Sequence, residues 1–344
     1  MRVCWATDYE GVGNSFGYFN MNAEARKAIV AAGMRLDPNA EIAVHVAPAH
    51  LFNPIEGKRN ILFTAWEMED LPPRYVKDMS KADAIVVTAS FLVPVVKRHL
   101  PEKPVFLCHL GVDADTFHFI RREKPIGKPF RFLWVGAPNA RKGWELVLEA
   151  FRPFMCDRRF ELYIKTTVTE KTERIGNIIF DSRKMTKPEL ATLYRSAHCF
   201  VFPSFGEGFG LTMAEAMATG LPVVYTPWSS LTDLAPAHAG RFGYPLKYTM
   251  IPACVTGTGG ILAPQPCGES EAEATPTQLA QADTADLAEK MREVWMSHKH
   301  ALKIGARGAA RIRAQFTWNH TGRCLKKILE EVQITWQPAH SFAT

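Results

Sequence analysis

The sequence predicts two doubly wound α/β domains, each with a parallel sheet that helices cover on both faces. Short, continuously apolar segments alternate with helical patterns along nearly the whole chain, and such segments are typical of strands buried on both faces. The length of 344 residues corresponds to about two domains. A charged segment rich in proline and glycine interrupts the pattern near residue 120, as expected of a linker.

The apolar segments form one set on each side of this interruption. The first set predicts strands at Val3–Ala6, Ile42–Val46, Ile61–Trp66, Ala84–Thr88 and Val105–His109. The second set predicts strands at Arg131–Val135, Leu162–Lys165, Ile178–Phe180, Cys199–Phe202 and Val223–Tyr225. Helical patterns between them supply the crossover connections that parallel strands require.

These patterns predict an N-terminal domain over residues 1–120, a linker over 121–130 and a C-terminal domain over 131–316. Residues 257–277 are rich in Gly, Pro, Ser and Glu, so we expect an irregular surface insertion there. The last predicted element is an amphipathic helix within residues 317–344, which has apolar residues at helical spacing: Leu325, Ile328, Leu329 and Val332.

Composition indicates a globular protein with a substantial core, because 47% of residues are apolar and 22% are charged. No apolar run is long enough to cross a bilayer, and the N-terminus has the pattern of a strand and not of a signal peptide. Seven scattered cysteines without a CxxC pair favour free thiols in a cytoplasmic protein. The net charge of +6 suits an anionic partner or is a plain surface excess.

Residues 202–224, FPSFGEGFGLTMAEAMATGLPVV, are the most informative segment. They predict a strand that ends at Phe202, a turn containing Gly206, Gly208 and Gly210, and a helix from Leu211 to Thr219. Glycines let the backbone approach a ligand closely. The N-terminus of the following helix presents N–H groups and partial positive charge, which suit phosphate oxygens.

Two glutamates accompany this turn. Glu215 lies at the edge of the helix's apolar stripe, where a carboxylate needs hydrogen-bond donors such as sugar hydroxyls. Glu207 precedes the helix and is expected on the other side of the same ligand. The pattern indicates a nucleotide-sugar site, and the alternative on spacing alone is a glycine turn with one surface and one ion-paired glutamate.

The spacing Glu207-x7-Glu215, with its flanks PSxxGEGFGL and EAMAxGxPVV, resembles the E-x7-E signature of retaining family 4 glycosyltransferases with the GT-B fold. Val135-Gly136 followed by Lys142-Gly143 is similar to the element that opens the family's second domain. Residues 82–90, 110–113 and 316–318 also resemble family segments, so the likeness extends over residues 60–330.

The resemblance implies two Rossmann-like domains facing across a cleft, with the last helix crossing back to the first domain. It also implies transfer, with retention, from a nucleotide-diphosphate sugar to an acceptor hydroxyl without a metal or cofactor. UDP is favoured as the donor nucleotide, and GDP and ADP stay open. The sequence itself has no cluster with metal-ligand spacing.

By the same resemblance, Glu215 would bind the ribose, Glu207 the donor sugar and Lys142 the diphosphate. Arg141 would share the work of Lys142, or else the diphosphate site is weaker, because Ala137 stands where many members have an arginine. Other donor-binding residues are expected to be Gly11, Gly13, Asn14, Gly136, Gly208, Phe209, Gly210, Leu211 and Thr212. The catalytic candidates are Glu207, Lys142 and Glu67; Glu67 orients an acceptor hydroxyl or is an ordinary helix-start carboxylate.

A glycan or lipid-linked acceptor is expected, with peripheral membrane contact through a basic patch of Lys97, Arg98, His99 and Lys103 beside Phe91 and Leu92. Two further acceptor classes stay open: DNA with a hydroxymethylated base, which would have to be flipped out, and a small molecule or protein. The alternative of another class is a nucleotide-sugar-binding protein without catalysis.

Overall fold

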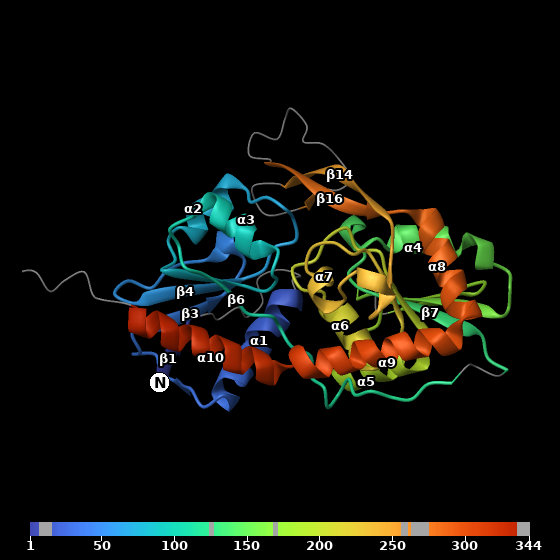
Figure 1. Ribbon diagram of the computed structural model, residues 1–344, viewed down its shortest axis with the longest axis horizontal. Helices are drawn as coiled ribbons and strands as arrows, with labels where there is room; N and C mark the ends of the chain where they lie inside the picture. Colours follow the sequence, from blue (N-terminus) through green and yellow to red (C-terminus); the bar gives the residue numbers. More distant parts are fainter. Residues whose placement is uncertain (7–15, 124–126, 168–170, 256–260, 263–274, 336–344) are drawn as a thin grey trace, which may run out of the picture. The chain divides into compact units, whose positions relative to one another are not determined.

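The computed structural model describes residues 1–6, 16–123, 127–167, 171–255, 261–262 and 275–335. The chain folds into two compact units. Unit 1 holds Met1–Trp66, Pro73–Gly111 and Trp318–Thr344, and unit 2 holds Glu67–Pro72 and Val112–Thr317. Each unit contains a parallel sheet with helices packed on it, which confirms the predicted fold class (Figure 1). Among the described residues, no helix is long and apolar enough to span a membrane.

The sheet of unit 1 has six parallel strands in the order β2-β1-β3-β4-β5-β6. Its strands are β1 (Arg2–Trp5), β2 (Arg35–Leu36), β3 (Ile42–Val46), β4 (Arg59–Thr64), β5 (Ala84–Val87) and β6 (Val105–Leu107). The helices of its N-terminal part are α1 (Phe16–Ala31), η1 (Ala49–Leu51), α2 (Pro73–Met79) and α3 (Leu92–His99). Every residue of β3, β4 and β5 is buried, because helices cover the central strands on both faces.

The last helix, α10 (Trp318–Thr335), completes unit 1 by packing against α1. Its predicted apolar stripe of Leu325, Ile328, Leu329 and Val332 is buried. The two helices approach closely at Gly322, where a Cβ atom would lie 2.2 Å from the carbonyl oxygen of Ala28. The predicted return of the final helix to the first α/β unit is therefore confirmed.

The sheet of unit 2 has the order β13-β12-β11-β7-β8-β10-β9 and is parallel except for the edge strand β9. Its strands are β7 (Phe130–Val135), β8 (Phe160–Lys165), β9 (Thr172–Ile175), β10 (Ile178–Asp181), β11 (Cys199–Phe202), β12 (Val223–Tyr225) and β13 (Tyr244–Pro245). Its helices are η2 (Ala140–Lys142), α4 (Trp144–Phe151), η3 (Arg152–Phe154), α5 (Lys187–Ser196), α6 (Leu211–Ala218), α7 (Leu231–Leu234), η4 (His238–Gly240), α8 (Thr284–Met296) and α9 (His298–Gln315).

A buried acidic group joins β8 and β10. Asp181 is fully buried and accepts hydrogen bonds from Tyr163 Oη at 2.6 Å and from Arg183 Nη2 at 2.7 Å. Burial alone would raise the pKa of Asp181, but the bonds from Arg183 and Tyr163 lower it below its ordinary value. This group therefore ties together the carboxyl ends of two neighbouring strands.

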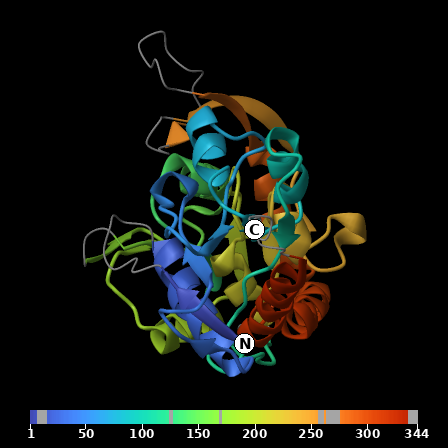
Figure 2. The same cartoon turned by 90° about the vertical axis from the view of Figure 1, so that its left-hand side faces the viewer.

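A second sheet of unit 2 is an antiparallel ribbon at the top of Figures 1 and 2. It consists of β14 (Tyr248–Val255) between β15 (Ile261–Leu262) and β16 (Thr275–Ala282). Of the expected irregular insertion over 257–277, the structure describes residues 261–262 and 275–277, which lie in these strands. Their pairing with β14, which spacing along the chain does not reveal, overrides a composition poor in strand formers.

The cysteines also differ from expectation. Cys4, Cys108, Cys156, Cys199 and Cys324 are free thiols, but Cys254 on β14 is disulfide-bonded. The prediction of free thiols throughout is therefore wrong at Cys254.

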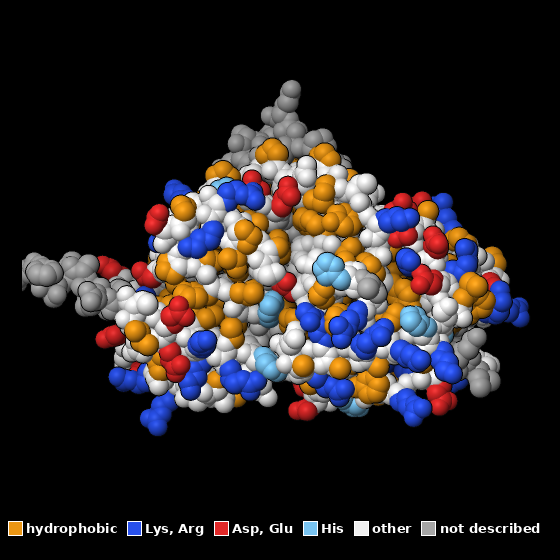
Figure 3. All heavy atoms as spheres, in the orientation of Figure 1, with side chains coloured by type: hydrophobic (Ala, Val, Ile, Leu, Met, Phe, Trp, Pro, Cys, Tyr) orange, Lys and Arg blue, Asp and Glu red, His pale blue; other side chains and the backbone are white. Residues whose placement is uncertain are grey.

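Basic side chains gather over α9 on the face shown in Figure 3. This helix contains no acidic residue, and Lys299, Lys303 and Arg307 recur on it every four residues with exposed side chains. Part of the positive net charge is therefore concentrated on one helix of unit 2.

Candidate active site

Lys142 is placed by the connection that follows β7. Asn139 caps η2 by accepting a hydrogen bond from the Lys142 N–H at 3.2 Å, and Trp134 Nε1 donates to the Lys142 carbonyl at 3.1 Å. The Gly136 N–H donates to the Lys165 carbonyl at 3.0 Å, which keeps the start of this connection beside β8. These bonds hold the backbone of Lys142 at the carboxyl end of the parallel sheet, where open α/β sheets bind ligands.

The glycine-rich loop after β11 is bound directly to this connection. The Phe205 N–H donates to the Arg141 carbonyl at 2.8 Å, and Arg141 Nη1 donates to the Gly206 carbonyl. Two segments that lie more than 60 residues apart in the sequence thus form one polar surface at the ends of β7 and β11.

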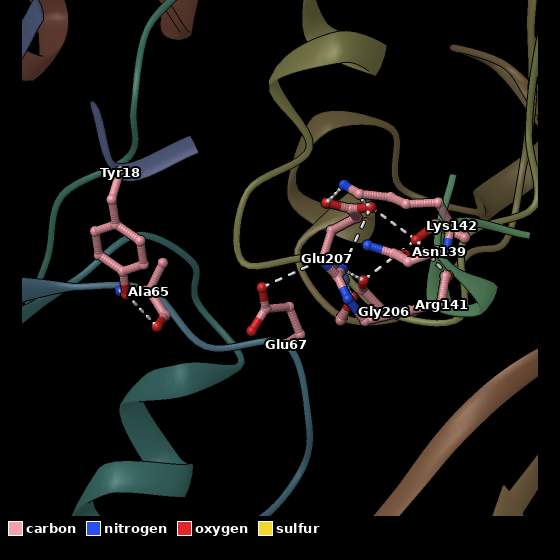
Figure 4. Close-up of polar contacts among 10 residues, drawn as sticks. Tyr18, Ala65, Glu67, Asn139, Arg141, Lys142, Gly206 and Glu207 are labelled. Atoms are coloured by element: carbon pink, nitrogen blue, oxygen red, sulfur yellow. Dashed lines mark hydrogen bonds and ion pairs between the residues drawn. The ribbon is translucent and has the colours of Figure 1, made fainter. Parts of the chain in front are cut away.

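Glu207 is the centre of this surface (Figure 4). Its carboxylate accepts from Lys142 Nζ at 2.7 and 2.8 Å and from Ser204 Oγ at 2.7 Å, and Arg141 Nη1 lies 3.6 Å away. Its own N–H donates to Ser229 Oγ at 2.9 Å. The side chain is almost completely buried, so both its carboxylate and its backbone are held in position.

The pKa values of this pair follow from burial and charge. Burial alone would raise the pKa of Glu207, but Lys142 and Arg141 lower it below its ordinary value. Burial lowers the pKa of Lys142, and the attraction of Glu207 opposes that shift. Glu207 is therefore ionised at neutral pH beside two cations.

Glu67 also lies in unit 2, since Glu67–Pro72 belongs to that unit. Its Oε1 is 3.4 Å from Arg141 Nη2, and its side chain is 26% exposed (Figure 4). Ala65, two residues before Glu67, belongs to unit 1. Tyr18 Oη donates to the Ala65 carbonyl at 2.7 Å and accepts from the Ala65 N–H at 2.9 Å. Glu67 is thus part of the same charged surface as Arg141, which no pattern in the sequence indicates.

The helix after the glycine loop begins at Leu211, as predicted. Gly210 precedes it with a φ of 88°, and a Cβ atom there would lie 2.5 Å from Leu231 Cδ2. Glycine is therefore favoured at this position, because the backbone is left-handed and a side chain would have no room. The first turn, with Leu211 and Thr212, presents the positive end of the helix dipole at the loop.

Glu215 lies one turn further along α6. Its Oε2 accepts a hydrogen bond from Tyr194 Oη at 3.2 Å. Burial raises the pKa of Glu215 to about 7, although Tyr194 and Lys187 oppose that shift. Its carboxylate thus has a weaker charge partner than Glu207 has, and hydroxyl donors from a ligand would stabilise its ionised form.

The structure brings together Lys142, Arg141, Glu207 and Glu67, and it places Gly208, Phe209 and Gly210 between Glu207 and α6. Gly11, Gly13 and Asn14 lie outside the described residues. Sequence reasoning missed four residues with positioning bonds, which are Asn139, Tyr194, Ser204 and Ser229. Of these, Asn139 carries a signal in the sequence, since asparagine is a preferred residue at the cap before a helical turn.

Part of the patch expected to contact a membrane is used within unit 1. Leu92 is buried, Lys97 Nζ donates to the carbonyls of Pro101 and Lys103, and Lys103 Nζ donates to that of Ala82. Arg98 is exposed, so peripheral membrane contact stays a prediction. Within the described ranges, no three His, Cys, Asp or Glu side chains form a group that could hold a metal ion.

Residues 129–244, which include Lys142, Glu207 and Glu215, match the family model described as "Glycosyl transferases group 1". The matched residues are about a third of the chain and contain the candidate site.

Curated relatives match part of the chain. The D-inositol 3-phosphate glycosyltransferase of Pseudarthrobacter chlorophenolicus is 33% identical over 132 residues, which are 34% of this chain and 28% of that protein. The MMP alpha-(1->4)-mannosyltransferase of Mycolicibacterium hassiacum is 28% identical over 180 residues, 49% of this chain and 41% of that protein. The matched segments therefore span less than half the length of these relatives.

Solved structures extend the likeness in fold to both units of the chain. Sucrose-phosphate synthase from Thermosynechococcus elongatus aligns with a TM-score of 0.64 and 14% identity, covering 96% of this chain and 82% of that one. Anabaena HepE, solved in complex with UDP and glucose, aligns with a TM-score of 0.61 and 11% identity, covering 92% and 83%. At these identities the likeness concerns the fold, and it confirms the GT-B class.

Proposed function

We propose that this protein transfers a sugar from a nucleotide-diphosphate sugar, with UDP as the nucleotide, to an acceptor hydroxyl with retention of configuration. The observation that carries the proposal is the convergence of Lys142 and Arg141 on the Glu207 carboxylate, beside the glycine loop at the start of α6. Cations and helix N–H groups suit the diphosphate, and a fixed carboxylate suits sugar hydroxyls.

Each residue has a role in this reaction. Lys142 and Arg141 stabilise the charge that grows on the diphosphate as the bond from the anomeric carbon to its oxygen breaks. Glu207 holds donor-sugar hydroxyls, with the loop backbone of Gly208, Phe209 and Gly210. The new bond joins the acceptor oxygen to the same face of the anomeric carbon, and the acceptor proton passes to the leaving phosphate oxygen. Catalysis then consists of orientation and charge stabilisation.

Glu215 and Glu67 act at the two ends of the donor. Glu215 accepts hydrogen bonds from the ribose hydroxyls, since its half-buried carboxylate is otherwise bonded by Tyr194 at 3.2 Å. Glu67, 3.4 Å from Arg141, orients the acceptor hydroxyl close to the diphosphate-binding cations. The remaining donor contacts are assigned to Gly136, Leu211, Thr212 and the loop of Gly11, Gly13 and Asn14.

A glycan or lipid-linked acceptor agrees with the names of relatives, which include "O-antigen chain mannosyltransferase B" of Escherichia coli. DNA with hydroxymethylated bases is the second candidate, because the exposed cations of α9 would suit a phosphate backbone. Binding of the sugar nucleotide without catalysis is the candidate of another class. It is disfavoured because Lys142 and Glu207 are both present and lie together at the site.

The test is a panel of UDP-, GDP- and ADP-sugars, with nucleotide release measured alone and with glycan, lipid-linked and hydroxymethylated duplex DNA acceptors. We expect release from a UDP-sugar, stimulation by the glycan or lipid acceptor, and a loss of about 100-fold for Lys142→Met. Because the protein's own cations serve the diphosphate, activity is expected to survive EDTA. Tight nucleotide binding without turnover of any donor would instead favour the non-catalytic alternative.

A further inference from the structure

We propose that the ribbon of β14 and β16 braces the loop that carries Glu207, and that Leu279 on β16 is a positioning residue for donor-sugar selection. The inference deepens the proposed function and rests on its assignment of Glu207 to the donor sugar. It also assigns a role to the stretch before α8, in which the sequence showed no strand.

The brace begins with a backbone hydrogen bond from the ribbon to the loop. The Ala280 N–H donates to the Phe205 carbonyl at 3.0 Å. Ala280 is paired with Met250 on β14, and alternate residues of an antiparallel strand direct their N–H groups away from the partner strand. The Ala280 N–H therefore bonds the loop, while the residues before and after Ala280 on β16 form the hydrogen bonds to β14.

Packing around Gly206 is the second part of the brace. A Cβ atom on Gly206 would lie 2.5 Å from the Glu67 carbonyl oxygen, 2.7 Å from the Trp228 ring and 3.2 Å from Leu279 Cδ2. Gly206 is thus enclosed by three segments of unit 2: residues 67–72, the segment after β12, and β16. Leu279 is completely buried, so its side chain fills the space beneath the loop.

The base of the ribbon is itself anchored. The Lys247 N–H donates to Asp286 Oδ2 at 2.8 Å, and the Asp283 N–H donates to the Lys247 carbonyl at 2.9 Å. Asp283 also caps α8. The position of α8 therefore constrains the end of β16, and β16 in turn constrains the loop.

The position of the loop matters because Gly206 is the residue next to Glu207. The cavity that Leu279→Ala creates would let Gly206 and the following backbone shift toward it. Misplacement of a substrate-positioning group by about 1 Å can lower a rate by about 100-fold. The ribose contact of Glu215 lies on α6, and the backbone of Lys142 is held by its own bonds to Asn139 and Trp134. We therefore expect sugar discrimination to fall more than affinity for the free nucleotide.

The first experiment is independent of any activity. Hydrogen exchange of the amides of residues 204–210 is compared in the wild type, Leu279→Ala, Leu279→Met and the control Leu162→Ala. Leu162 is equally buried but lies on β8, outside the ribbon and its anchor. We expect exchange to accelerate by about tenfold or more in Leu279→Ala, with the other variants within about threefold of the wild type. Equal acceleration in Leu279→Ala and Leu162→Ala, or none in either, would overturn the brace.

The second experiment measures selectivity. For the best UDP-sugar and its C4 epimer, the ratio of kcat/KM values is expected to fall about tenfold in Leu279→Ala and to recover in Leu279→Met. The Kd of UDP is expected to stay within about threefold. If the ratio and the Kd change in parallel, Leu279 acts through general stability and the selectivity claim is wrong. If the wild type uses no nucleotide sugar, the proposed function is refuted, and the exchange experiment still decides the brace.

Discussion

Replacing Lys142 by methionine tests the centre of the site, since methionine keeps most of the side-chain length and removes the charge. Lys142 Nζ is 2.7 and 2.8 Å from the Glu207 oxygens, and the two side chains are 17% and 6% exposed. Removing one partner of a buried ion pair costs about 3–5 kcal/mol. Ser204 at 2.7 Å and Arg141 at 3.6 Å remain for Glu207, so we expect a loss of about 3 kcal/mol in the free energy of unfolding.

A double-mutant cycle isolates the pair. Glu207→Gln should cost about 1–2 kcal/mol, because Lys142 retains access to water. The double variant should lose about 2 kcal/mol, since neither charge is then left buried and unpaired, which gives a coupling of about 2–3 kcal/mol. Urea unfolding of the four proteins measures these values. Additive losses would show that the two side chains do not form a pair in solution.

The pH dependence of this loss has a definite sign. In the wild type the cations lower the pKa of Glu207, so its contribution to stability is present at neutral pH and is lost as the pH falls through that lowered pKa. Without Lys142, burial favours the protonated carboxyl. The difference between wild type and Lys142→Met should therefore be largest near pH 7 and smaller near about pH 4. A difference that grows on acidification would refute the assignment of charges.

Three further predictions concern other parts of the molecule. The pKa of Glu215 is raised to about 7, so its contribution to stability is lost as the pH rises through 7. Glu215→Gln should flatten this pH dependence of the free energy of unfolding, measured by urea titration at several pH values. The same variant should weaken UDP binding by about 10- to 100-fold in calorimetry. Asp181→Asn should lower the free energy of unfolding by about 2 kcal/mol at pH 7 and less in acid, because the amide has one accepting oxygen in place of two and no charge to pair with Arg183. Gly322→Ala should destabilise unit 1 by about 1–3 kcal/mol, since its Cβ would meet the Ala28 carbonyl at 2.2 Å. Its control Gly17→Ala, with no atom within 4 Å, should be neutral or slightly stabilising in the same thermal unfolding assay.

The strands that sequence reasoning found are those covered by helices on both faces. All ten predicted strands are present to within two residues, from β1 and β3 to β8 and from β10 to β12. A continuous apolar segment is a strong signal because both faces of such a strand are buried. Of the strands that were missed, β2 and β13 are short and β9 is exposed, so their residues are not constrained to be apolar. The longer β14 and β16 are only partly buried, so they also lack a continuous apolar segment.

The amino-acid sequence by itself determined the glycine loop, the helix at Leu211 and the presence of Glu207, Glu215 and Lys142 in one unit, because the residue types required for that loop are local. Only the tertiary structure decided which charges meet. Arg141 lies between Glu67 and Glu207, and β16 is bonded to Phe205, through contacts across 66 to 75 residues of chain. Such pairings depend on strand order and on the packing of buried side chains, and neither leaves a periodic pattern in the sequence.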